Sequence, residues 1–216
     1  MDTLQAILLG IVQGITEFLP VSSSGHLQIA KELLGVEIDN NITFDVTLHA
    51  ATVLSTIVVM RHEIAQLAGG LFSRRFNAEQ AYAVKIAISM IPAGIVGVCF
   101  ADRIEELFAS LGFVGAMLLV TAALLAFAYY ARPRQKSEIS YRDAFVIGLA
   151  QAAATLPGLS RSGSTIATGL LLGNSKESTA HFSFLMVIPV ILGKMLLDIL
   201  SGEMGAMEVP AAALAG

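Results

Sequence analysis

The sequence predicts an all-α polytopic membrane protein that is built from inverted repeats. Of its 216 residues, 55% are apolar and only 14% are charged, and the mean hydropathy is +0.73. Soluble domains carry about one quarter charged residues, so a soluble globule and a disordered chain are both disfavoured. The net charge of −4 gives no reason to expect a nucleic-acid partner. The single cysteine, Cys99, excludes an internal disulfide.

Apolar stretches of two lengths predict two kinds of helical element. A transmembrane helix takes about 20 residues, and the runs at 6–19 and 144–156 are too short for this. Each of these runs stops at a proline and a Ser/Gly-rich turn, and then resumes as a second short run that ends in Leu-Leu-Gly. This pattern predicts a re-entrant helical hairpin, because polar backbone at membrane depth must be buried in protein or line a wet cavity. Full crossings are predicted at 44–60, 82–101, 112–131 and 180–200.

The two hairpin segments are copies of each other, offset by 138 residues. The Ser-x-Ser-Gly turn at 22–25 matches the one at 160–163, and Leu-Leu-Gly at 33–35 matches 171–173. Three predicted crossings lie between the copies. Because this number is odd, the second copy enters the membrane from the opposite face, and its broken helix meets the first near the midplane.

We interpret residues 1–216 as one integral-membrane domain, with repeat one at 1–143 and repeat two at 144–216. The second copy holds 73 residues against a repeat period of 138. We therefore expect two C-terminal crossings to be missing, and the 216-residue form to be unstable or inactive alone. Basic residues in the loops 61–81 and 132–143 predict that these loops are cytoplasmic. The first hairpin then enters from outside, and the second from the cytoplasm.

Ionisable side chains mark the first hairpin. Glu17 lies one helical turn after Gln13, so the two share a face. A charged carboxylate inside an apolar hairpin is energetically unfavourable without a partner. One interpretation is structural, an ion pair or a protonated acid. The other is functional, a metal ligand or a general base. His26 opens the second half-helix directly after three serines, which favours the functional interpretation.

The second hairpin carries Arg161 among hydroxyl side chains. Free backbone N–H groups at a helix start, an Arg fork and hydroxyls suit a phosphate. The alternative is that the Ser-Gly residues only build the turn and Arg161 faces a lipid headgroup. Glu17, His26 and Arg161 lie where the two copies differ, whereas the shared serines can be turn chemistry alone. If the hairpin tips meet, these groups fit phosphoryl transfer.

Other candidates rank lower. Inverted repeats with broken helices also describe carriers of anions or lipid phosphates, so a transporter is the alternative function. The remaining ionisable residues of interest are a pair that lines the pocket or closes a helix end (Asp45, His49), two interfacial histidines (His62, His181) and a structural bridge (Lys194, Asp198).

Two long motifs resemble a known family. Residues 13–27 (QGITEFLPVSSSGHL) and 157–166 (PGLSRSGSTI) are similar to the two signatures of the undecaprenyl-pyrophosphate phosphatases, the bacitracin-resistance family. The resemblance continues through 141–145 and 182–185 and covers essentially the whole chain. The family's first signature carries Glu or Gln at the position of Gln13.

The resemblance implies a membrane hydrolase that removes the terminal phosphate of the C55 carrier pyrophosphate and so supplies cell-wall synthesis. It implies a plasma-membrane location with the active site on the outer side, and a polyprenyl pyrophosphate substrate that bacitracin also binds. It leaves a homodimer as an alternative to a monomer. A divalent metal, Mg or Ca, would be held by Glu17 and Gln13, although Gln13 supplies no carboxylate. Ser23 would be the nucleophile, assisted by His26, or His26 itself. The expected pyrophosphate-binding set is Arg161, Ser22, Ser24, Ser160, Ser162, Gly163 and Thr165.

Overall fold

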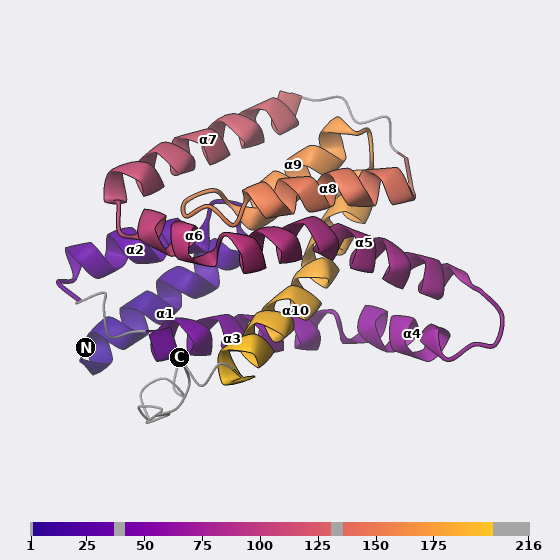
Figure 1. The fold of residues 1–216 in the computed structure, drawn as a ribbon, viewed down its shortest axis with the longest axis horizontal. Helices are drawn as coiled ribbons and strands as arrows, with labels where there is room; N and C mark the ends of the chain where they lie inside the picture. The colour runs from indigo at the N-terminus through magenta and orange to yellow at the C-terminus, as the bar shows by residue number, and fades with distance from the viewer. Residues whose placement is uncertain (1, 37–41, 131–135, 201–216) are drawn as a thin grey trace.

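The computed structural model describes residues 2–36, 42–130 and 136–200, and the regular structure there is helical apart from one bridge between Lys136 and Asn174. The all-α prediction is confirmed for this part of the chain. Side chains at 42, 43, 45, 46 and 194–200 are not described, so the calls on Asp45, Lys194 and Asp198 lie outside it. Figure 1 shows α1 (Thr3–Phe18), α2 (Ser23–Leu33), α3 (Ile42–Val59), α4 (Arg61–Leu71), α5 (Ala78–Cys99), α6 (Ala101–Phe108), α7 (Leu111–Tyr130), α8 (Tyr141–Ala153), α9 (Arg161–Leu171) and α10 (Lys176–Leu200).

Helices cover all four predicted crossings, as α3, α5, α7 and α10. Among the described residues, α5 and α7 are both long and apolar enough to cross a membrane. The apolar part of α3 that is fully described, Thr47–Val59, is shorter than a full crossing, as is α1. Together with the composition, these helices indicate a membrane protein.

Two expected loops contain helices, so the loop predictions at 61–81 and 102–111 are wrong in part. Helix α4 has no buried residue, and α6 half-buries only Ile104, Leu107 and Phe108. An amphipathic helix needs apolar residues at spacings of three and four, not one long apolar run. Charged residues interrupt such a run, which is why both segments read as loops.

A pair of short helices joined by a turn forms at each of the two predicted hairpins. Helix α1 turns into α2 at 19–22, and α8 turns into α9 at 154–160. Ser22 caps α2 and Ser160 caps α9, each through its side-chain oxygen. The Leu-Leu-Gly landmarks end the second helix of each hairpin, where Gly35 (φ 63°) and Gly173 (φ 91°) adopt the left-handed conformation that favours glycine.

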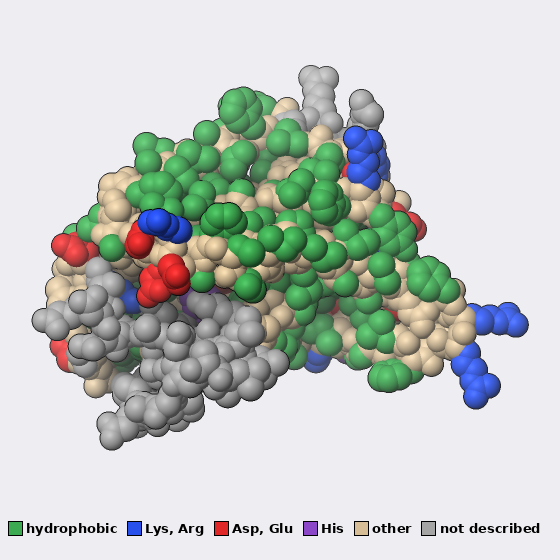
Figure 2. Space-filling view, in the orientation of Figure 1, with side chains coloured by type: hydrophobic (Ala, Val, Ile, Leu, Met, Phe, Trp, Pro, Cys, Tyr) green, Lys and Arg blue, Asp and Glu red, His purple; other side chains and the backbone are tan. Residues whose placement is uncertain are grey.

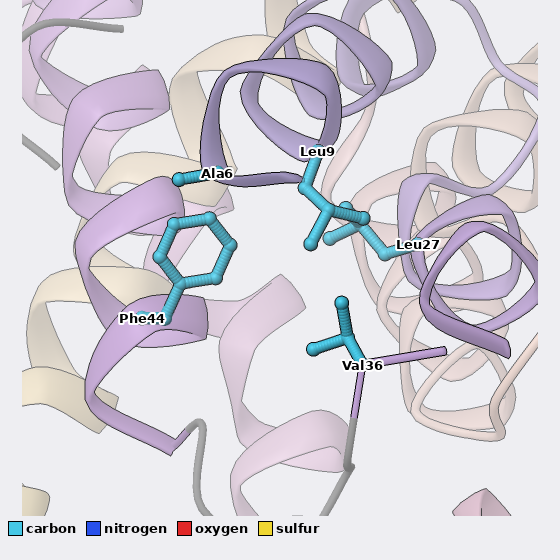
Figure 3. Packing of buried hydrophobic residues seen from close by; sticks show 5 residues of the cluster. All are labelled: Ala6, Leu9, Leu27, Val36 and Phe44. Atoms are coloured by element: carbon cyan, nitrogen blue, oxygen red, sulfur yellow. The ribbon is translucent and has the colours of Figure 1, made fainter. Parts of the chain in front are cut away.

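The repeat is visible in the packing as well. One buried cluster holds α1, α2 and α3 together around Ala6, Leu9 and Phe44, with Leu27 and Val36 (Figure 3). A second cluster joins α8 and α10 and contains Ala144, Ile147 and Phe182, with Ile139 and Met186. The first three residues of each set are offset by 138 positions. Equivalent positions of the two copies are therefore buried in equivalent hydrophobic clusters.

The hairpins extend from opposite ends of the molecule and their tips meet (Figure 1). Contacts between the tips are reciprocal. A Cβ on Gly163 of the second hairpin would lie 2.7 Å from the Pro20 carbonyl oxygen of the first. A Cβ on Gly25 of the first would lie 3.2 Å from the Cα of Gly158 in the second. Only glycine allows so close an approach of the two turns.

A third element fixes the second turn. Thr121 of α7 donates its hydroxyl to the Gly158 carbonyl oxygen at 3.0 Å and accepts the Ser160 N–H at 2.9 Å. The side chain of Thr121 is buried. Both polar groups of this turn are therefore satisfied inside the helix bundle.

Candidate active site

An ion pair joins the two hairpin tips. Arg161 opens α9 and donates Nη2–H to Oε1 of Glu17, in the last turn of α1, at 2.6 Å. The Glu17 side chain is 8% exposed and that of Arg161 is 23% exposed. These residues are 144 positions apart in sequence, and the structure brings them together as converging tips require. A pair this well buried provides each charge with the partner that it needs.

The second oxygen of Glu17 is also occupied. The hydroxyl of Ser23 donates to Oε2, and the amide of Gln13 donates Nε2–H to the same oxygen at 3.1 Å. Ser23 is the first residue of α2, while Gln13 lies one turn before Glu17 in α1. Glu17 therefore gathers a hydroxyl, an amide and a guanidinium from three helices.

The ring of His26 bonds to the backbone. Its Nδ1 lies 2.8 Å from the Ser22 carbonyl oxygen, and because a carbonyl only accepts, Nδ1 carries the proton. Nε2 is then the basic nitrogen of the neutral ring. Among the described side chains, the hydroxyl of Ser23 bonds to Glu17 and not to His26.

Backbone strain accompanies this bond. Ser22 has φ 73° and is the one non-glycine residue with positive φ in the described part of the chain. Its carbonyl oxygen accepts both the backbone N–H of His26 at 3.2 Å and the ring Nδ1–H. Such strain is typical of sites where surrounding structure holds a functional group in place.

The shared serines build the turns. Ser22 Oγ accepts the Gly25 N–H at 3.3 Å, and Ser160 Oγ accepts the Gly163 N–H at 3.0 Å. The second serine of each turn lies close to the first, with Ser24 Oγ 3.3 Å from Ser22 Oγ. The matching pair, Ser160 and Ser162, is separated by 3.4 Å. This supports the turn-chemistry interpretation.

The hydroxyl of Thr165 makes its contacts inside the helix bundle. Its hydroxyl lies 2.9 Å from the Arg161 carbonyl oxygen and 2.7 Å from the Ser183 hydroxyl, and the residue is 1% exposed. Arg161 is the member of the expected pyrophosphate-binding set that places a charge beside Glu17. Binding by the others stays a prediction.

A small pocket adjoins the ion pair. Its lining combines polar or charged residues (Glu17, Thr52, Thr56, Arg161, Ser162) with apolar ones (Phe18, Val53, Phe184, Val187, Ile191). The rings of Phe18 and Phe184 pack with their centroids 6.3 Å apart. A lining that combines an ion pair with apolar side chains suits an amphiphile with an anionic head.

Thr52 is the site residue that the sequence reading missed. Its Oγ1 accepts from Gln13 Nε2 at 3.4 Å, and it is 8% exposed. The sequence shows only two threonines one turn apart in an apolar run, Thr52 and Thr56, and this does not say which of them faces Gln13. Of the lower-ranked candidates, His49 is half-buried on α3, and His62 and His181 are exposed.

Known proteins match the chain over its whole length. The sequence model of the family described as bacitracin resistance protein BacA matches residues 6–216. The chain belongs to this family. It is 60% identical to an undecaprenyl-diphosphatase of Parabacteroides distasonis, over 100% of this chain and 82% of the relative. It is 57% identical to the Bacteroides fragilis enzyme of that name (99% and 82%) and 40% identical to that of Methanosphaera stadtmanae (92% and 78%). The predicted family is thus confirmed.

The oxygen donors of the site fit a hard divalent cation. Glu17 offers a carboxylate and Gln13 a carbonyl oxygen, Oε1, which is buried without a hydrogen-bond partner. No group of three or more His, Cys, Asp or Glu side chains that could hold a metal occurs among the residues described. Mg²⁺ is commonly bound by one or two carboxylates together with substrate phosphates, so a single carboxylate suffices for such a site.

Proposed function

We propose that this chain is an undecaprenyl-diphosphatase, a membrane hydrolase that converts undecaprenyl pyrophosphate to undecaprenyl phosphate and inorganic phosphate. Relatives at up to 60% identity carry this name. The observation that carries the proposal is the Glu17–Arg161 pair with Ser23 on the same carboxylate, beside an apolar-walled pocket. The product recycles the lipid carrier for cell-wall synthesis and underlies bacitracin resistance.

The alternative of a lipid-phosphate carrier gains no support. The relatives are named for hydrolysis, and a carrier needs charge complementarity but no nucleophile. Here a hydroxyl is held on a carboxylate at the pocket, which is the arrangement of a nucleophile beside a base.

The geometry supports a two-step reaction. Arg161 binds the terminal phosphate, and Ser23 Oγ attacks its phosphorus while the bond to the bridging oxygen breaks and undecaprenyl phosphate leaves. The Ser23 proton passes to Glu17, which already accepts it in a hydrogen bond. A water molecule, deprotonated by Nε2 of His26, then attacks the phosphoserine; the bond from phosphorus to Ser23 Oγ breaks, phosphate leaves, and the proton on Glu17 returns to Oγ. Attack by Nε2 of His26 itself is the alternative.

A divalent cation, Mg or Ca, is part of the proposal. When bound, it neutralises phosphate charge in the developing transition state. Glu17 and the Oε1 of Gln13 would hold it. With the cation bound, Arg161, now paired with Glu17, would be free to bind the phosphate.

An inverted repeat in the membrane is the topology that we propose. Reciprocal contacts between the tips and the equivalent cores support a pseudo-twofold relation. Figure 2 shows Lys and Arg side chains at the end where α4 turns into α5, and acidic side chains at the opposite end near α6. Arg74 and Arg75 are exposed in that turn. The basic end would face the cytoplasm, so the first hairpin enters from the outer side of the plasma membrane.

Phosphate release from farnesyl pyrophosphate in detergent tests the function. We expect release with Mg²⁺ or Ca²⁺ and none with a chelator, because Arg161, which is already paired with Glu17, cannot alone neutralise the charge of a pyrophosphate. Movement of a lipid phosphate across vesicles that depends on Arg161, without any release, would contradict the proposal and favour a carrier.

Trapping the phosphorylated enzyme identifies the nucleophile. After a brief reaction with a substrate labelled in the terminal phosphate and quenching, we expect an acid-stable label on Ser23, which Ser23→Ala removes. An acid-labile, alkali-stable label that His26→Ala removes would show that His26 is the nucleophile instead.

A further inference from the structure

Thr52 lies in α3, and its hydroxyl proton is already used in a hydrogen bond. Its Oγ1 donates to the Leu48 carbonyl oxygen, one turn earlier, at 2.9 Å. A hydroxyl has one proton to donate. Toward Gln13, whose amide nitrogen lies 3.4 Å away, Thr52 therefore acts as an acceptor.

Two acceptors thus face the same end of the Gln13 amide. Nε2 donates one proton toward Glu17 Oε2 at 3.1 Å and the other toward Thr52 Oγ1 at 3.4 Å. A flipped amide would place Oε1 against a carboxylate oxygen and a hydroxyl lone pair, which is repulsive. The orientation leaves Oε1 buried without a donor, in a residue that is 2% exposed. A buried unpaired acceptor is unfavourable unless something pairs with it.

We propose that Thr52 is a positioning residue, which together with Glu17 fixes the Gln13 amide so that its Oε1 is free to bind the divalent cation. This inference rests on the proposed function and adds a residue on α3 to a site that is otherwise formed by the two hairpins. The Glu17 carboxylate is shared among Gln13, Ser23 and Arg161, whereas Thr52 is fixed by its bond to Leu48. Thr52 is then the acceptor that holds the amide throughout the cycle.

Binding of Mn²⁺ to the full chain in detergent, followed by loss of the free-ion EPR signal, tests this directly. Thr52→Val keeps the shape and removes the acceptor, and it should weaken Mn²⁺ binding by about 10-fold or more, as loss of an outer-shell partner typically does. Thr52→Ser keeps the hydroxyl and should restore binding.

Thr56→Val is the matched control. Thr56 is 3% exposed, lines the same pocket and makes the same kind of bond one turn back, to the Thr52 carbonyl oxygen at 2.9 Å, but the hydrogen bonds described for it include none to Gln13. Its loss should lower the unfolding temperature by the same amount but leave the Mn²⁺ affinity unchanged. If Thr52→Val does not fold, Thr52→Ala is compared with Thr56→Ala in the same way.

Equal Mn²⁺ affinity in Thr52→Val and Thr56→Val would overturn the positioning role, as would a wild-type chain that releases phosphate without binding Mn²⁺. Both results leave the phosphatase proposal intact. That proposal fails separately, if the wild-type chain releases no phosphate with any divalent cation.

Discussion

Glu17→Gln is expected to lower phosphate release by about 10²- to 10³-fold and also to destabilise the fold. The amide keeps the shape but cannot take the Ser23 proton or carry charge to the cation. It also leaves the Arg161 guanidinium without its carboxylate. Removing one partner of a buried pair costs about 3–5 kcal/mol, and we expect the lower end because Arg161 keeps 23% exposure. Phosphate release and thermal unfolding measure the two effects.

A second substitution separates catalysis from stability. If the Glu17–Arg161 pair were only structural, Glu17→Gln with Arg161→Gln would repair the uncompensated charge and restore whatever the single variants lost. We expect the double variant to recover unfolding temperature relative to either single one, because their effects on a shared contact are not additive. Its phosphate release should stay as low as in the worse single variant. Recovery of release in the double variant would show that the pair is structural.

The converging tips could be predicted from the sequence because their evidence is local and repeated. Turn residues, proline stops and the 138-residue offset identify both hairpins. Three predicted crossings between them, an odd number, led to the expectation that the tips meet, and Glu17 and Arg161 are in contact in the structure. Helix caps and left-handed glycines depend only on residues close in sequence. The turn pattern therefore identifies the caps Ser22 and Ser160 and the Leu-Leu-Gly helix ends.

Contacts that depend on helix rotation could not be predicted. Thr52 reaches Gln13 only because α3 packs on α1 in one register, and 39 residues separate the two. The partner of His26 depends on the positive φ of Ser22. A sequence indicates positive φ at a glycine, but not at a serine. The contact of Ser23 with Glu17 also depends on how α1 and α2 are placed, and assistance by His26 stays a prediction.

The reciprocal tip contacts lead to a graded prediction for three glycines. Gly163→Ala should destabilise the fold by about 1–3 kcal/mol, the usual cost of overpacking, because its new Cβ would lie 2.7 Å from a rigid backbone oxygen of Pro20. Gly25→Ala should cost less, since one of its nearest neighbours, the Leu118 side chain at 3.1 Å, can move. Gly10→Ala, in α1 with nothing within 4 Å, should stabilise by roughly 0.5–1 kcal/mol. Urea or thermal unfolding in detergent gives the order.

The same series tests whether activity depends on how closely the tips approach. Separating the turns pulls Arg161, two residues before Gly163, away from the Glu17 carboxylate that now lies 2.6 Å from it. Displacements of about 1 Å at a site can cost about 10²-fold in rate. Gly163→Ala should therefore lose phosphate release even at temperatures where it is folded, while Gly10→Ala keeps it. Full release from folded Gly163→Ala would mean that the tips tolerate separation, and that the close contact serves packing alone.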